Sequence, residues 1–299
     1  MLDKIWHRIQ IRCGGGLTRD LLTSFKQYIL HRDVYNKFAL EICMRAYFLG
    51  TARYKPDELL KKYFLHGDYY DFGIMRIPAV NQSEQEFILF YEFLDLIFPY
   101  LISWKPEVIL NEGAYEDFGV RVDERDIVID LGANIGMFTG FALWKGAQKV
   151  YAFEPVPYVL DYLKQTVEVN DYGNKVEIIP WAVMDKKGEI DICIDEENFG
   201  GSSCILARKK NKKVKTKAVT LDEFVGENNI DRIDFIKADI EGAERYMLMG
   251  AKNVLREFKP KLALCTYHLP DDREVMTDLI LEANPSYNIK YSKFKLYAI

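Results

Sequence analysis

The sequence predicts an α/β fold, a mostly parallel sheet covered by helices, with a mainly helical extension before it. Three observations carry this prediction. After residue 126, short apolar runs of strand length alternate with helix-like segments, which is typical of βαβ units. Over residues 1–110, apolar side chains recur mostly at helical spacing. The last two strand-like runs are joined by two residues, too few for a parallel crossover, so the sheet is expected to end in an antiparallel hairpin.

The composition is that of a globular protein. The chain has 299 residues, enough for about two domains at roughly 150 residues each. Lys and Arg number 40 and Asp and Glu 45, for a formal charge of −5, and apolar residues make up 49%. These values exclude a largely disordered chain and a nucleic-acid binder that works through overall charge. We expect no nucleic-acid partner.

Cysteine usage and hydropathy point to the cytoplasm. The five cysteines are odd in number, widely spaced and without a CxxC pair, which favours a reduced protein with no cysteine zinc site. The N-terminal MLDKIWHRIQIR lacks the continuous apolar core of a signal peptide. The most apolar stretch, 87–104, contains Glu92 and Asp95, so we expect a buried or amphipathic helix and no membrane span.

Residues 1–110 are predicted to form a helical extension or cap. The expected elements are helices around 21–29 and 38–49, a strand or hairpin over 69–80 around Gly73, and an apolar helix that a capping-box pattern opens at 83–86. The extension is either a plain helical cap or a substrate lid or dimer surface, so homo-oligomerisation stays open.

Residues 111–299 are predicted to form the second domain. Its expected strands are 127–131, 150–153, 176–179, 235–238 and 262–266, and its expected helices are 137–145, 158–169, 243–257 and 274–283. The terminal hairpin is expected over 287–291 and 294–299. An insert at about 186–221 has strands near 189–194 and 215–221, and its run of Arg and Lys indicates either a solvated hairpin or a phosphate or acidic-substrate contact.

A glycine-rich loop and a glutamate predict a nucleoside cofactor. Asp130 closes an apolar strand, Gly132 would allow a tight turn, and Gly136 would allow close approach of the next helix and a ligand. That helix start offers N–H groups to a carboxylate or phosphate. Glu154 ends the next strand, where it can accept hydrogen bonds from two ribose hydroxyls. NAD and S-adenosylmethionine both carry adenosine, so this pair alone leaves both open.

Three features favour S-adenosylmethionine. Asn134 stands where the dinucleotide fingerprint has its second glycine. The antiparallel terminal hairpin does not suit a doubled mononucleotide fold. The strand at 235–238 is followed by two carboxylates, Asp239 and Glu241, over the crevice where open α/β sheets bind ligands.

An ordered set of motifs resembles the FkbM-type S-adenosylmethionine-dependent methyltransferases. The motifs are GANIG at 132–136, YAFEP at 151–155, TLDEF at 220–224, IKADIEGAE at 236–244 and YH at 267–268. The segment NEGAYE at 111–116 also resembles the strand before the glycine loop in that family, with Ala114 where proline is usual. The resemblance covers about residues 110–299, and residues 1–100 carry no family signature.

The resemblance implies a class I methyltransferase fold, a Rossmann-like seven-stranded sheet with an antiparallel last strand. It implies O-methylation of a hydroxyl on a sugar, glycan or small secondary metabolite. The site residues it implies are Asp130, Gly132, Asn134 and Gly136 in the cofactor loop, Glu154 at the ribose, Trp181 and Ala182 near adenine, and Asp239 nearest the sulfonium.

Transfer to an alcohol also requires removal of a proton, which makes His268, Glu241 and Asp239 the catalytic candidates. His268 is the one histidine of four that follows a core strand. Asp271 and Asp272 would either cap the next helix or join Asp239 and His268 around Mg²⁺ or Mn²⁺. The substrate-wall candidates are Glu112, Tyr115 and Ser202.

Two other functions stay open at this point. A nicotinamide-dependent oxidoreductase on a Rossmann-like sheet would bind NAD(H) and not S-adenosylhomocysteine. A non-catalytic cofactor-binding module would bind S-adenosylhomocysteine and transfer no methyl group. Asn134 and the terminal hairpin weigh against the first, and the acidic and imidazole side chains at the strand ends weigh against the second.

Overall fold

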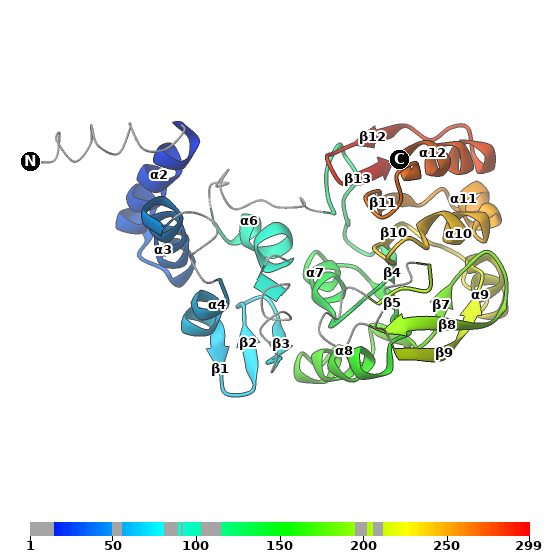
Figure 1. Ribbon diagram of the computed structural model, residues 1–299, viewed down its shortest axis with the longest axis horizontal. Coiled ribbons are helices and arrows are strands. Elements are labelled where there is room, and N and C mark those ends of the chain that lie inside the picture. Colours follow the sequence, from blue (N-terminus) through cyan, green and yellow to red (C-terminus); the bar gives the residue numbers. More distant parts are fainter. Residues whose placement is uncertain are drawn as a thin grey trace, which may run out of the picture. The chain divides into compact units, whose positions relative to one another are not determined.

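The computed structural model describes residues 15–49, 56–80, 89–90, 92–102, 115–194, 202–205 and 212–299 (Figure 1). The chain divides into two compact units, which we call the first unit (Met1–Tyr70 with Ala79–Glu112) and the second unit (Asp71–Pro78 with Gly113–Ile299). The segment Asp71–Pro78 therefore belongs with the second unit, although the sequence places it inside the helical extension.

The first unit is mainly helical in its described part. Its elements are α2 (Gly15–His31), α3 (Val34–Leu49), α4 (Pro56–Phe64), β1 (Leu65–His66), η2 (Phe93–Ile97) and α6 (Phe98–Leu101). The helices expected around 21–29 and 38–49 are confirmed as α2 and α3, and the capping-box pattern at 83–86 lies outside the described residues. Phe38 is buried and makes edge contacts with Phe64, Phe93 and Phe98. In the described part of the chain, no helix combines the length and apolar character needed to cross a membrane.

The expected hairpin over 69–80 is present as β2 (Tyr69–Asp71) and β3 (Arg76–Pro78). Gly73 lies between these two strands with a φ of 78°. The backbone N–H of Arg76 donates to Asn170 Oδ1 over 2.7 Å, and Asn170 Nδ2 donates to Arg76 O over 2.7 Å. This reciprocal pair ties β3 to the end of α8 (Pro157–Val169) and explains why β3 belongs to the second unit.

The second unit is built on a seven-stranded sheet in the order β12-β13-β11-β10-β4-β5-β6. Its strands are β4 (Ile127–Leu131), β5 (Lys149–Phe153), β6 (Val176–Ile179), β10 (Phe235–Ala238), β11 (Lys261–Cys265), β12 (Ile289–Tyr291) and β13 (Lys295–Ala298). β4, β5, β6, β10 and β11 pair in parallel, and β13 runs antiparallel to both β11 and β12. This is the predicted mostly parallel sheet with its antiparallel terminal strand.

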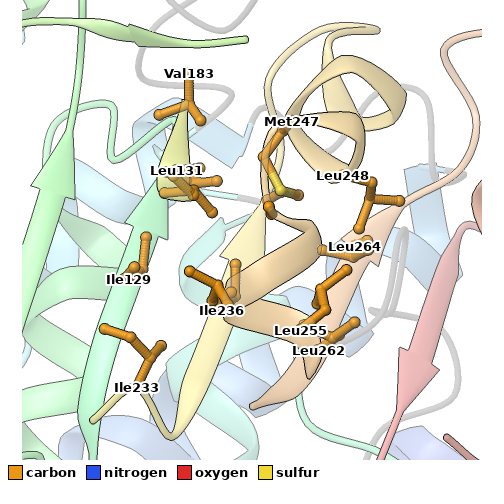
Figure 2. Close-up of a cluster of buried hydrophobic side chains, with 14 of the residues drawn as sticks. Ile129, Leu131, Val183, Ile233, Ile236, Met247, Leu248, Leu255, Leu262 and Leu264 are labelled. Atoms are coloured by element: carbon orange, nitrogen blue, oxygen red, sulfur yellow. The ribbon is translucent and has the colours of Figure 1, made fainter. Parts of the chain in front are cut away.

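Alternating side chains give the sheet two buried faces. One face packs on α9 (Leu221–Glu227), α10 (Glu244–Met249), α11 (Lys252–Glu257) and α12 (Asp272–Ala283). Figure 2 shows Ile129, Ile236 and Leu264 of the sheet in one buried cluster with Met247 and Leu248 of α10. The other face carries α7 (Met137–Trp144), whose Phe138 stacks on Phe235 with ring centroids 5.8 Å apart. Burial on both faces is typical of parallel sheets.

Two expected elements differ from the structure. The helix predicted over 243–257 is two helices, α10 and α11, separated at Gly250. A Cβ at Gly250 would lie 2.3 Å from the carbonyl oxygen of Met184, so a close backbone approach interrupts the helix there. The strand predicted over 215–221 is β9 (Lys212–Val219). It ends two residues earlier than predicted, because Thr220 forms a capping box with Glu223 at the start of α9.

The insert forms a small sheet in the order β7-β9-β8, with β7 (Ala182–Val183) parallel and β8 (Gly188–Ile194) antiparallel to β9. Lys215 Nζ lies 2.6 Å from Glu189 Oε1, and Lys213 Nζ lies 3.9 Å from Asp191 Oδ2. These exposed pairs across the hairpin match the solvated interpretation of the charge run for the lysines of β9; residues 206–211 lie outside the described part.

Candidate active site

The candidate residues gather where β4, β5, β10 and β11 end. The carboxyl ends of parallel strands meet at one edge of a sheet, which is where open α/β sheets bind ligands. β4 leads into the glycine loop 132–136, β5 into Glu154, β10 into Asp239, and β11 into Tyr267 and His268. All of them belong to the second unit.

The glycine loop lies directly against the end of β10. Gly132 has a φ of +71°, and a Cβ built on it would stand 2.0 Å from the carbonyl oxygen of Asp239. Any other residue would clash with backbone there. Gly136, with a φ of 97°, is the N-cap residue of α7. The tight turn expected at Gly132 is present, and the close approach of a ligand at Gly136 stays a prediction.

Asp130 lies beneath the loop and not in the mouth of the site. Its side chain is fully buried, 3.1 Å from Lys237 Nζ, and accepts a hydrogen bond from Thr139 Oγ1 over 2.7 Å. Lys237 in turn donates to the carbonyl oxygen of Gly132 over 2.7 Å. Burial lowers the pKa of Lys237, but Asp130 and Asp239 more than offset it and raise that pKa. Asp130 is thus turned inward to Lys237, and its role in the cofactor loop stays a prediction.

Glu154 is a buried carboxylate at the tip of β5. Its Oε2 accepts from the backbone N–H of Asn134 over 3.0 Å, and its Oε1 accepts from that of Val156 over 2.9 Å. Burial raises the pKa of Glu154 to about 7. A carboxylate has about four lone-pair positions, so two are left for hydroxyl donors. Asn134 Oδ1 beside it is buried and finds no donor among the described residues, which marks a place for a donor from a ligand.

Asp239 is held by two tyrosines. Tyr115 OH donates to Oδ2 over 2.7 Å, and Tyr267 OH donates to Oδ1 over 3.3 Å. Burial raises the pKa of Asp239, but Lys237 and His268 more than offset it, so the pKa lies below its ordinary value. Tyr115, a substrate-wall candidate, thus contacts the predicted sulfonium-side carboxylate directly.

His268 lies among three carboxylates. Its Nε2 is 3.7 Å from both Asp239 Oδ1 and Glu241 Oε1, and its Nδ1 is 3.1 Å from Glu244 Oε1. The side chain is 3% exposed. Burial lowers the pKa of His268, but Glu241, Glu244 and Asp239 raise it to about 11. The imidazole is therefore charged at neutral pH in the ligand-free protein.

Glu241 stands on a left-handed backbone, with a φ of 53°. Such a conformation is uncommon outside glycine and persists where the surroundings hold it. Ser203 of the insert does so here, because its Oγ donates to the carbonyl oxygen of Glu241 over 2.6 Å. The sequence singled out the neighbouring Ser202, whose role stays a prediction. Glu112, the other substrate candidate, lies outside the described residues.

Trp181 and Ala182 follow β6 as expected. Trp181 packs partly buried on the main core, and the Nζ of Lys217 lies 3.4 Å from the centre of its ring. Ala182 is buried at the start of β7. Their place beside adenine stays a prediction.

Asp271 and Asp272 bind Arg245, whose Nη2 lies 2.7 Å from Asp271 Oδ1 and 2.6 Å from Asp272 Oδ1. Asp272 Oδ2 accepts from the backbone N–H of Leu269 over 2.8 Å. The role of Asp271 and Asp272 as ligands of a divalent ion stays a prediction. Among the described residues, the side chains that bring one ligand atom each within 4.8 Å of one another are those of Asp239, Glu241 and His268.

Sequence reasoning missed three participants: Lys237, Glu244 and Tyr267. Lys237 could have been found, because a lysine inside an otherwise apolar strand is rarely buried without a counter-charge. Glu244 and Tyr267 stand in the motifs at 236–244 and 267–268, but their contacts cross between elements, so the motifs gave them no role.

The sequence profile of the Methyltransferase FkbM domain family matches residues 130–288, just over half of the chain. Methyltransferase sdnD of Sordaria araneosa is 28% identical over 154 residues, 41% of this chain and 59% of that protein. The 31-O-demethyl-FK506 methyltransferase FkbM of Streptomyces tacrolimicus is 26% identical over 175 residues, 48% of this chain and 66% of that protein. The chain thus spans about three fifths to two thirds of these relatives.

A crystal structure of Methyltransferase FkbM from Methylobacillus flagellatus KT aligns over 96% of this chain and 60% of its own, with 16% identity and a TM-score of 0.48. The match to the family profile includes the glycine loop, Glu154, Asp239, Glu241 and His268. The chain belongs to the FkbM methyltransferase family.

Proposed function

We propose that this protein is an S-adenosylmethionine-dependent O-methyltransferase whose acceptor is a hydroxyl of a sugar, glycan or small metabolite. The observation that carries the proposal is the cluster of Asp239, Glu241 and His268 at the strand ends beside the glycine loop and Glu154. The family membership supports methyl transfer, and the cluster supports a hydroxyl acceptor, because an alcohol needs help to lose its proton.

The residues present suit this cofactor. Glu154 keeps acceptor positions for ribose hydroxyls, and Asn134 Oδ1 is a buried acceptor in need of a donor. Asp239 is an ionised carboxylate for a cationic group. When bound, S-adenosylmethionine supplies a methyl group on positively charged sulfur.

The cluster divides the proton chemistry between its members. His268 already carries a proton at neutral pH, so we assign acceptance of the hydroxyl proton to the Glu241 carboxylate. The charged imidazole, 3.7 Å from both Asp239 and Glu241, then stabilises negative charge that develops on the acceptor oxygen. Tyr115 and Tyr267 keep Asp239 in place through their hydrogen bonds.

Mg²⁺ or Mn²⁺ at the cluster stays a prediction, and so does homo-oligomerisation. Carboxylate and imidazole ligands suit these ions, but His268 would first have to give up its proton. Calorimetry with and without each ion tests the metal, and sedimentation tests the oligomer.

The first experiment is a calorimetric titration of the purified protein with S-adenosylhomocysteine. We expect binding, and we expect Glu154→Ala to abolish it. Glu177→Ala is the matched control, because Glu177 lies in the neighbouring strand β6 and pairs with Lys149 at the surface. NAD(H) is titrated in parallel. If the protein binds NAD(H) but not S-adenosylhomocysteine, the proposal is wrong and the oxidoreductase hypothesis is favoured.

A second experiment separates catalysis from binding alone. The protein is incubated with methyl-labelled S-adenosylmethionine and a pool of sugars, glycans and hydroxylated metabolites. We expect label in the pool with the wild type and none with Glu241→Gln. Cofactor binding without transfer to any hydroxyl compound would favour the non-catalytic module.

A further inference from the structure

Glu244 is a fully buried carboxylate at the first residue of α10. Its Oε1 accepts from the backbone N–H of Ile240 over 2.8 Å, and its Oε2 accepts from that of Gly242 over 3.0 Å. The carboxylate therefore has one fixed position inside the turn that carries Glu241.

The same Oε1 lies 3.1 Å from Nδ1 of His268. The other ring nitrogen, Nε2, lies 3.7 Å from both Asp239 Oδ1 and Glu241 Oε1. The ring thus turns one nitrogen toward Glu244, inside the protein, and the other toward the gap between the two carboxylates of the mouth. A buried imidazole without such a partner could rotate and exchange the two nitrogens.

We propose that Glu244 is a positioning residue for methyl transfer: its carboxylate forms an ion pair with His268, 3.1 Å from Nδ1, and so sets the ring with Nε2 toward the acceptor oxygen. This inference rests on the proposed function. A carboxylate that holds the distal nitrogen of a catalytic histidine fixes both the orientation of the ring and which nitrogen faces the substrate. Because Glu244 also ties the turn at Gly242, it sets the positions of His268 and Glu241 together.

A plain structural role is the competing explanation, since Glu244 also secures the start of α10. Glu244→Gln removes the charge beside the imidazole and keeps one of the two oxygens that accept N–H groups of the turn, whereas Glu244→Ala removes both, so the two variants together separate the roles. Glu223→Gln is the control: the Glu223 carboxylate accepts from the backbone N–H of Thr220 in the capping box of another helix, α9.

The experiment is proton NMR of protein labelled with nitrogen-15 histidine. With four histidines in the chain, His268→Asn assigns the signals of His268. We expect a slowly exchanging, strongly downfield Nδ1–H proton in the wild type and in Glu223→Gln. Glu244→Gln should move it upfield, and Glu244→Ala should lose it to exchange. An unchanged resonance in Glu244→Gln, or a wild-type resonance on Nε2 alone, would overturn the inference.

Cofactor affinity and turnover are measured on the same samples. We expect Glu244→Gln to keep its affinity for S-adenosylhomocysteine within about threefold, and to lower kcat for labelled-methyl transfer by at least about tenfold. If the wild type binds no S-adenosylhomocysteine, the proposed function fails, whatever the NMR result. If it binds and turns over, and Glu244→Gln keeps full kcat, only the positioning role fails. If Glu244→Gln does not fold, Glu244→Asp, which keeps the negative charge, replaces it. Folded Glu244→Asp should show the Nδ1–H resonance, and a folded Glu244→Asp protein without that resonance would count against the inference.

Discussion

Lys237 Nζ lies 3.1 Å from Asp130 Oδ1, and the two side chains are 5% and 0% exposed. The pair joins β10 to β4 directly beneath the glycine loop, because Lys237 also donates to the carbonyl oxygen of Gly132. The same buried ion pair therefore stabilises the sheet and holds the glycine loop in position.

Replacing Lys237 by Met should destabilise the protein by about 3–5 kcal/mol, because it leaves the Asp130 carboxylate buried without its partner. Urea denaturation measures this. Lys215→Met is the control: its pair with Glu189 is exposed to solvent, so its loss should leave the urea midpoint almost unchanged. Asp130→Asn combined with Lys237→Met should recover part of the loss. A Lys237→Met protein as stable as the wild type would contradict the structural role of the pair.

Gly132→Ala should lower the melting temperature and abolish S-adenosylhomocysteine binding, because the added Cβ meets the carbonyl oxygen of Asp239. Gly226→Ala in α9 is the matched control, since a Cβ there meets nothing within 4 Å. That change should stabilise the protein by about 0.5–1 kcal/mol, the usual gain for alanine over glycine in a helix. Differential scanning calorimetry compares the two. Tight binding of S-adenosylhomocysteine by Gly132→Ala would show that the close approach is not required.

The affinity for S-adenosylhomocysteine should fall as the pH falls through 7. Burial raises the pKa of Glu154 to about 7, and ribose hydroxyls bind the ionised form better because it only accepts hydrogen bonds. From pH 8 to pH 6 the ionised fraction drops about tenfold, and the affinity should drop with it. Calorimetry across this range measures the change. Glu154→Gln should bind weakly with little pH dependence; an equal dependence in that variant would assign the effect to another group.

Protein stability should decrease between pH 7 and pH 10 because of His268. Burial lowers the folded-state pKa of His268, but the neighbouring carboxylates raise it to about 11, above the ordinary histidine value of about 6.5. The stabilising contribution is therefore complete below about pH 6.5 and is lost as the pH rises through about 11. One proton contributes a slope of at most about 1.4 kcal/mol per pH unit in this window. Urea titrations of the wild type and His268→Asn at matched pH isolate the contribution of His268 to the free energy of unfolding. Parallel stability curves for the two proteins would rule out a strongly bound proton.

The strand ends could be predicted because their signal is local. Apolar runs with β propensity identify β4, β5 and β10, and the rule for βαβ units brings their carboxyl ends to one edge. Glu154 and Asp239 follow directly, since each stands immediately after such a run. The antiparallel β13 was also accessible, because a two-residue connection leaves no alternative.

The ion-pair partners of the acidic side chains could not be predicted in the same way. Asp271 and Asp272 follow His268 closely in sequence, yet they bind Arg245 of α10. The orientation of α10 against α12 decides that pairing, and no periodicity in either segment encodes it. Glu241 takes their place beside His268 for the same reason, with its left-handed backbone secured by Ser203 from the insert.

The residues alone predict the succession of strands and helices along the chain, the two carboxylates that follow β5 and β10, and the family resemblance. These depend on spacing along the chain, which is visible in the residues. The tertiary structure alone decided that Asp130 turns inward to Lys237, that Glu244 reaches His268, and that His268 holds a proton among carboxylates. Those outcomes depend on strand register, helix rotation and burial, which bring charges together across long separations in sequence and raise or lower their pKa values.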